Sequence, residues 1–108
     1  MTLKKSVIEM DLKTGACKEL AEMSDYRCYV STTVLDNYIY AIGGLNGADR
    51  LNTAERYDPI TNQWSKISDM NVVRSDASAC THNGKIYVAG GLNSLSIEAS
   101  LECYDPAN

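Results

Sequence analysis

A repeat with a period of 47 residues is the feature of this sequence that most constrains its fold. The segment YIYAIGG at residues 38–44 returns as KIYVAGG at residues 85–91, and each copy carries Tyr-Asp-Pro at the same offset. Between residues 23–61 and 70–108 the residues that recur in register are Met, Arg, Ser, Ile-Tyr, Gly-Gly-Leu-Asn, Glu and Tyr-Asp-Pro. Periods of roughly 20 to 50 residues are typical of solenoids and propellers, so the repeat indicates the fold more strongly than any single residue does.

Each period contains short runs with strand-forming preferences and no sustained helical periodicity. In the first full unit these runs are residues 30–35, 38–42, 53–57 and 63–67, and in the next they are 77–81, 86–89 and 99–104. Asp36-Asn37 and Asn83-Gly84 can close two-residue turns, because these residues tolerate the positive φ of tight hairpins. The pattern predicts an all-β fold of four-stranded antiparallel meanders, which stack radially as the blades of a propeller.

The register of the repeat divides the chain into three parts. We expect residues 1–23 to form the outer strands of a preceding blade, with Cys17 aligned on Trp64. Residues 24–70 form a complete repeat, and residues 71–108 form a repeat that stops before its fourth strand. A partial propeller leaves blade faces and strand edges uncovered, which predicts poor solubility or self-association.

Composition and charge argue against several classes of function. The ten Lys and Arg residues are scattered in a chain of net charge −4, which disfavours a nucleic-acid surface. The longest apolar run, residues 38–42, is far shorter than the roughly 20 residues that span a bilayer. No apolar core of a signal peptide follows the first residues. The cysteines lack the close spacing of metal ligands, and we expect reduced thiols in the cytoplasm.

The double glycine after an apolar strand, the tyrosine thirteen positions on and the tryptophan seven further resemble the kelch repeat. The resemblance extends over nearly the whole chain and implies the BTB-kelch (kelch-like) family, whose members carry a BTB domain, a BACK domain and six kelch repeats. It implies a partial β-propeller of about two and a half of those six blades. It also implies a substrate adaptor of cullin-3 ubiquitin ligases, in which the propeller binds a protein substrate. Cullin-3 would be bound only through BTB and BACK regions, which we expect to lie outside this chain.

The same resemblance assigns partner contacts to loops 45–52 and 92–98 and to the connections 24–28 and 71–76. The candidates are the arginine four positions after each repeated methionine together with the next residue, and the two residues after each double glycine. They are Arg27, Cys28, Leu45, Asn46, Arg74, Ser75, Leu92 and Asn93. An arginine suits acidic motifs, because its planar fork pairs with carboxylates bidentately. The alternative is that Arg27 and Arg74 brace the loops between blades, and the sequence leaves both interpretations open.

Other repeated residues are expected to be structural. Gly43, Gly44, Gly90 and Gly91 suit positive φ or a close backbone approach where a strand enters a loop, and they lack the spacing of a phosphate-binding loop. Tyr57, Trp64 and Tyr104 are expected to pack between neighbouring blades. The cysteine at position 17 departs from the tryptophan of the family pattern.

Two other functions were weighed against the adaptor. A kelch-type oxidase needs several His and Tyr ligands around copper, and His82 is the only histidine. We therefore expect no catalytic residue, no metal and no cofactor. A role in binding actin or the cytoskeleton, known for some kelch proteins, is not separated by this sequence from substrate adaptation.

Overall fold

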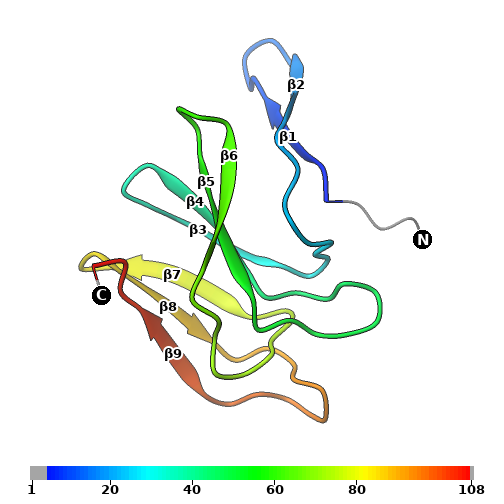
Figure 1. The fold of residues 1–108 in the computed structure, drawn as a ribbon, viewed down its shortest axis with the longest axis vertical. Coiled ribbons are helices and arrows are strands. Elements are labelled where there is room, and N and C mark those ends of the chain that lie inside the picture. Colours follow the sequence, from blue (N-terminus) through cyan, green and yellow to red (C-terminus); the bar gives the residue numbers. More distant parts are fainter. Residues whose placement is uncertain (1–4, 108) are drawn as a thin grey trace.

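The computed structural model describes residues 5–107, and these form three antiparallel sheets that follow one another in chain order (Figure 1). The predicted all-β class is confirmed, and the described residues contain no helix. The strands are β1 (Val7–Met10), β2 (Cys17–Leu20), β3 (Ser31–Leu35), β4 (Tyr38–Ile42), β5 (Ala54–Asp58), β6 (Gln63–Ile67), β7 (Ser78–His82), β8 (Lys85–Ala89) and β9 (Leu101–Tyr104).

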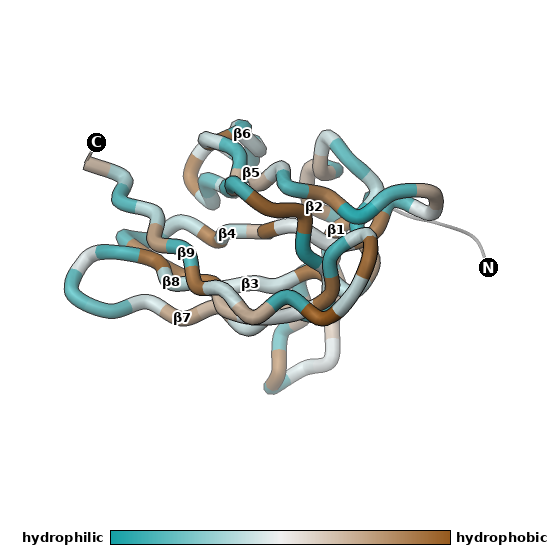
Figure 2. The backbone as a smooth tube through the Cα atoms, turned by 90° about the horizontal axis from the view of Figure 1, so that it is seen from below, coloured by the Kyte–Doolittle hydropathy of each residue, from teal (hydrophilic) through white to brown (hydrophobic). Residues whose placement is uncertain are grey.

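Within each sheet the strand order equals the chain order, which is the topology of a meander. The pair β1-β2 stands apart at one end, the four-stranded sheet β3-β4-β5-β6 lies in the middle, and β7-β8-β9 lies at the other end (Figure 1). The described chain therefore contains one four-stranded blade, one blade with three strands and two strands of another, as in a partial propeller. Figure 2 shows hydrophobic and hydrophilic stretches interspersed along the tube, and the central strands β4 and β5 have buried residues on both faces.

The register repeats from sheet to sheet. Met10 pairs with Cys17 across β1 and β2, and Tyr57 pairs with Trp64 across β5 and β6, so the weak N-terminal copy has the same strand pairing. The two-residue turns also repeat. Asp36 and Asn37 have φ of 51° and 66°, as a tight hairpin with matched twist requires.

Most strand ends agree with the sequence pattern to within a residue, and the last strand differs. A strand was predicted from residue 99, whereas β9 begins at Leu101. The reason lies in Ser100, whose carbonyl accepts hydrogen bonds from Gly90 N and from the guanidinium of Arg74. The chain is held by the loop at this point and joins the sheet one residue later.

The core lies between the middle sheet and the last sheet. Its buried members are Leu35, Tyr40, Ile42, Ala54, Ile86 and Val88. Burying one such aliphatic side chain contributes about 1.5–3 kcal/mol, so this face-to-face contact is the main source of stability in the chain. Next to the core, the hydroxyls of Thr33 on β3 and Thr81 on β7 lie 2.9 Å apart, and they join the two inner strands.

Candidate protein-interaction surface

The loops that follow β4 and β8 lie on one side of the molecule, opposite the hairpin turns after β3 and β7 (Figure 1). Together with the connections 24–29 and 71–76 we call them the loop surface (residues 24–29, 45–52, 71–76 and 92–98). In each of the two loops an asparagine side chain accepts hydrogen bonds from loop amides. Asn46 Oδ1 accepts the amides of Ala48 and Asp49 at 3.0 and 2.8 Å, and Asn93 Oδ1 accepts the equivalent amides of Leu95 and Ser96, each at 2.8 Å. These side chains give each loop a defined shape.

Backbone pairs hold each loop against the connection that precedes its blade. Cys28 and Leu45 exchange two hydrogen bonds of 2.9 and 2.8 Å, and Ser75 and Leu92 do the same at 3.0 and 2.8 Å. Neighbouring blades are joined too, since Gly44 N donates to Arg74 O at 2.8 Å. The structure thus places Cys28 beside Leu45 and Ser75 beside Leu92, and it joins the two repeats on this side of the molecule.

Arg27 lies beneath this surface with a fully buried side chain. Its Nη2 is 3.1 Å from Glu55 Oε2, and its Nη1 donates to the carbonyls of Gly43 and Thr53, each at 2.9 Å. Glu55, itself buried, also accepts the amide of Ser24 at 2.9 Å. The ion pair therefore ties the connection before the blade, the end of β4 and the start of β5 together.

The second blade repeats this arrangement. Arg74 Nη2 is 3.1 Å from Glu102 Oε2, and Arg74 Nη1 donates to Gly90 O at 3.1 Å and Ser100 O at 2.7 Å. Glu102 accepts the amide of Asn71 at 2.7 Å. One difference is exposure: the side chain of Glu102 is 15% exposed, whereas that of Glu55 is 0% exposed.

These contacts are of the kind expected if Arg27 and Arg74 brace the loops between blades. Neither guanidinium reaches the surface, and both point at carbonyls and carboxylates of their own blade. A contact of Arg27 or Arg74 with a partner stays a prediction, and it would require the arginine to leave a buried carboxylate. The remaining candidates Cys28, Leu45, Asn46, Leu92 and Asn93 are half-buried, and Ser75 is buried.

The double glycines provide the close approach that brings the loops to the connections. Gly43 and Gly91 have φ of 65° and 88°, and a Cβ would overlap Arg74 O at the first and Ser75 O at the second. Both positions therefore combine a left-handed backbone with contact to a carbonyl of the neighbouring connection. Gly44 and Gly90 also have positive φ.

Tyr57 and Trp64 lie at the face toward the first hairpin. Their ring centroids are 5.2 Å apart, and Trp64 Nε1 donates to Ala21 O at 2.9 Å. The indole thus connects β6 to the segment before this blade. At the equivalent position Cys17 is exposed and is one of the free cysteines of the described chain. Tyr104 on β9 packs toward the middle sheet, with its ring centroid 6.0 Å from that of Tyr40 on β4.

Sequence reasoning missed four exposed residues of the loop surface as individual candidates. Tyr29 is 58% exposed with φ of 54°, Leu95 is 96% exposed and Ile97 is 78% exposed. Asp76 is exposed with φ of 60°. The sequence did contain a signal for the second loop, because it has Leu95 and Ile97 at the positions where the first loop has Ala48 and Arg50. The backbone strain of Tyr29 carried no sequence signal.

Glu98 closes the second loop from its end. Asn93 Nδ2 donates to Glu98 Oε2 at 2.8 Å, and Ser100 N donates to Oε1 at 3.1 Å. These hydrogen bonds, first that of Asn93 and then those of Ser100, lower the pKa of Glu98 to about 2. The loop that carries Leu95 and Ile97 is therefore bonded internally at both ends.

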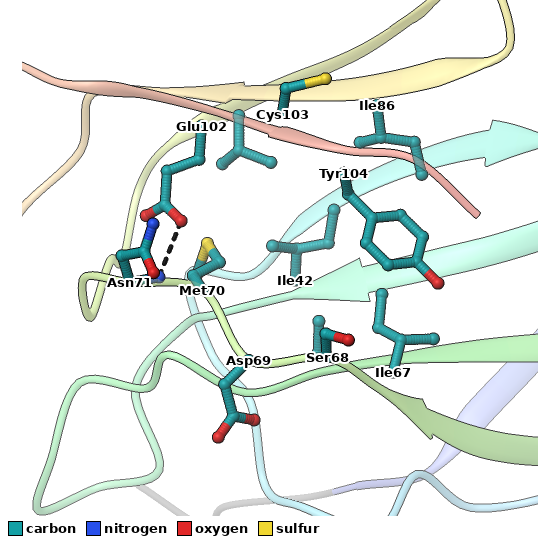
Figure 3. A pocket seen from close by; sticks show the side chains of 12 residues that line it. Ile42, Ile67, Ser68, Asp69, Met70, Asn71, Ile86, Glu102, Cys103 and Tyr104 are labelled. Carbon is teal, nitrogen blue, oxygen red and sulfur yellow. Dashed lines mark hydrogen bonds between the residues drawn. The ribbon is translucent and has the colours of Figure 1, made fainter. Parts of the chain in front are cut away.

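A cavity of about 160 Å³ lies between the two larger sheets (Figure 3). Ile42, Ile67, Ile86 and Tyr104 surround it, and burial raises the pKa of Tyr104. The one carboxylate with a dashed bond in Figure 3, Glu102, is engaged by the amide of Asn71. The cavity is thus a gap in the packing between blades, lined mostly by core side chains.

Within residues 5–107, no group of three or more His, Cys, Asp and Glu side chains is placed to hold a metal ion. His82, at the end of β7, is exposed. Within the same residues no helix has the length and hydropathy needed to cross a membrane.

The stacked meanders with loops gathered on one side define a class of protein, the β-propellers that are built from repeated blades. The family model described as Kelch motif matches residues 26–71 and 74–108. This chain belongs to the kelch-repeat family.

The names of the similar proteins include different additional domains. The chain is 42% identical over 76 residues to "Kelch repeat and BTB domain-containing protein F47D12.7" of Caenorhabditis elegans, covering 66% of this chain and 13% of that protein. It is 40% identical over 60 residues to "F-box/kelch-repeat protein At5g03020" of Arabidopsis thaliana, covering 53% and 17%. It is 35% identical over 69 residues to "Kelch-like protein 26" of Danio rerio, covering 59% and 11%. The chain therefore spans less than a fifth of the length of these relatives.

Proposed function

We propose that this chain is a non-catalytic protein-interaction module, part of the substrate-recognition propeller of a cullin-3 ubiquitin ligase adaptor in the cytoplasm. The observation that carries the proposal is the loop surface, where two loops and two connections are fixed side by side by repeated backbone pairs. A rigid scaffold that presents shaped loops is a common arrangement for binding sites.

The relatives support the division of labour in this proposal. The shared part is the kelch repeat, and it occurs in proteins whose names carry either BTB or F-box domains. Cullin-3 would be contacted by BTB and BACK regions of the intact protein, and the repeats would hold the substrate. Residues 24–70 and 71–108 are the repeat units that we infer, with residues 1–23 from a preceding one. From residues 23–31, 50–57 and 74–79 we also propose a relationship to kelch-like protein 10 within the family.

A deletion experiment tests the proposal. The intact protein is expected to co-purify with cullin-3 and with a substrate whose ubiquitination rises when the two are co-expressed. Deleting residues 24–108 should abolish substrate capture and leave cullin-3 binding in place. Substrate capture that survives the deletion, or an intact protein that binds no cullin-3, would refute the corresponding half of the proposal.

A further inference from the structure

Tyr29 and Asp76 share a left-handed backbone conformation, which aspartate tolerates and a tyrosine rarely adopts. Their φ values are 54° and 60°, at equivalent positions of the two repeats. For a residue with a Cβ the left-handed region costs about 1–2 kcal/mol, and for a bulky aromatic residue it marks a real outlier. Such strain persists where the surroundings enforce it, and it clusters at functional sites.

The surroundings of Tyr29 enforce the strain. Its neighbour Cys28 is paired with Leu45 on both backbone groups, and Tyr29 O accepts the amide of Asp76 at 3.0 Å. Within the described residues the ring is 58% exposed. Tyrosine is one of the residue types enriched among the anchors of protein interfaces.

Hydrogen bonds connect this pair to the apolar loop. Asp76 Oδ2 accepts the hydroxyl of Ser75 at 2.8 Å, and Ser75 is paired through its backbone with Leu92. Leu92 begins the loop that presents Leu95 and Ile97 to solvent, 96% and 78% exposed. The surface therefore carries an aromatic ring and a carboxylate on two backbone segments that a hydrogen bond joins, and aliphatic side chains on the loop bonded to the second segment.

The charge of this surface is negative once the buried pairs are removed. Arg27 and Arg74 are neutralised inside the blades by Glu55 and Glu102, and Asp25 lies 3.7 Å from Lys66. The carboxylates that remain on the loops and connections are Asp49, Asp76 and Glu98, against a single guanidinium.

That guanidinium belongs to Arg50, and the hydroxyl of Ser75 links it to Asp76. Its Nε donates to Ser75 Oγ at 2.9 Å, and the same hydroxyl donates to Asp76. The sequence left two interpretations of Arg27 and Arg74 open, contact with acidic motifs or bracing of the loops between blades. With Arg27 and Arg74 buried, charge complementarity favours the opposite sign.

We propose that the loop surface binds a peptide segment of a partner protein that is basic and apolar. A Lys or Arg side chain of the partner lies between the ring of Tyr29 and the carboxylate of Asp76, where cation–π attraction and an ion pair act together. Apolar side chains of the same segment cover Leu95 and Ile97. The inference rests on the proposed function, and it adds the chemistry of the partner.

Selection from a random twelve-residue phage-displayed peptide library on the immobilised intact protein tests the inference. Selected peptides should contain more Lys and Arg than Asp and Glu, together with Leu, Ile or Phe. Their affinity, measured by fluorescence anisotropy, should fall as salt is raised, because exposed charges are screened. Enrichment of acidic peptides that depend on the same loops would overturn the inference and leave the proposed function standing.

Matched variants locate the binding. Leu95→Ser with Ile97→Ser should weaken binding about tenfold or more, as expected for truncated anchors. The control is Leu12→Ser with Ile60→Ser, because these side chains are 92% and 93% exposed on turns outside the loop surface. The control should bind like the parent protein. Equal losses in both pairs, or no enriched peptide at all, would contradict both the inference and the assigned surface.

Tyr29→Asn separates binding from folding. Asparagine tolerates positive φ, so the melting temperature of this variant should stay the same or rise while peptide affinity falls. Asp76→Asn keeps the conformation and removes the charge, and it should weaken binding and flatten its salt dependence. A Tyr29→Asn variant that binds as the parent protein does would show that the strained ring is not an anchor.

Discussion

At the residue scale, the arginines show how far one position can differ from what its type suggests. Arg27 and Arg74 each lie four positions after a repeated methionine, and their chemistry would suit a partner carboxylate. The structure instead places a carboxylate of the same blade against each of them, 3.1 Å from Nη2. The recurrence of Glu55 and Glu102 in the sequence was the available signal, because each glutamate is as strictly periodic as its arginine.

Replacing Arg27 by alanine is expected to destabilise the chain more than replacing Arg74. Loss of one partner leaves a buried charge unpaired, which typically costs about 3–5 kcal/mol. Glu55 is fully buried, whereas Glu102 is partly exposed and water can solvate it. Denaturant unfolding of both variants measures the difference. A smaller loss for Arg27→Ala than for Arg74→Ala would contradict this description of the ion pairs.

Tyr29→Asn is expected to raise the free energy of unfolding by about 0.5–1 kcal/mol, because it relieves left-handed strain at a non-glycine residue. Asp76→Ala at the equivalent position is expected to lower the free energy of unfolding, because alanine tolerates positive φ less well than aspartate does. Chemical denaturation of both variants is the measurement. A destabilised Tyr29→Asn variant would mean that the exposed ring contributes packing that outweighs the strain.

Glu98 is expected to titrate far below an ordinary glutamate. Its pKa of about 2 is lower than the usual 4.5, so the folded chain binds this proton more weakly than the unfolded chain. The stabilising contribution is therefore complete above pH 4.5 and is lost as the pH falls toward 2. A carboxyl ¹³C titration by NMR gives the midpoint directly. Asn93→Ala removes the largest cause and should raise the midpoint, and a midpoint near 4.5 in the parent chain would refute the described bonds.

At the element scale, the strands were predictable and the contacts between loops were not. The period of 47 residues and the turn residues at 36–37 and 83–84 were enough to place the strands of each blade. The pairing of Cys28 with Leu45 joins residues with no pattern in common, and nothing in their types predicts it. The start of β9 at Leu101 likewise depends on hydrogen bonds made by a loop that is distant in sequence.

The two glycines after β8 are expected to respond differently to substitution. Alanine at either position meets the strain of positive φ, about 1–2 kcal/mol. At Gly91 the new Cβ also overlaps Ser75 O, whereas at Gly90 the nearest atom, Glu98 O, is 3.7 Å away. Gly91→Ala should therefore cost clearly more stability and should weaken the pairing of Ser75 with Leu92. Thermal unfolding measures the first effect and amide hydrogen exchange the second. Equal costs at the two positions would contradict the close approach.

At the scale of the whole molecule, the middle sheet packs on the last sheet, and within residues 5–107 no further sheet covers the far face of the last one. Cys80, Tyr87, Leu101 and Cys103 lie on the side of the last sheet that corresponds to the core-facing side of the middle one. Leu101 is 62% exposed. An apolar sheet face of this kind favours association.

The isolated chain of residues 1–108 is therefore expected to self-associate as its concentration rises. Leu101→Asp places a charge on the uncovered face and should shift the chain toward the monomer, as measured by sedimentation velocity. Ile60→Asp adds the same charge on an outer turn that is 93% exposed, and it serves as the control. A parent chain that stays monomeric at all concentrations, or equal effects of the two substitutions, would contradict this role of the face.

Site-specific photo-crosslinking tests the central claim, that the loop surface is where this molecule meets a protein partner. A photoreactive amino acid is placed at Ala48 and at Ser94, which are exposed in the two loops, and at Ile60 on the outer turn. Crosslinks from the intact protein to a co-purified substrate are predicted at positions 48 and 94 and not at position 60. Crosslinks at position 60 without any at the two loops would contradict the claim.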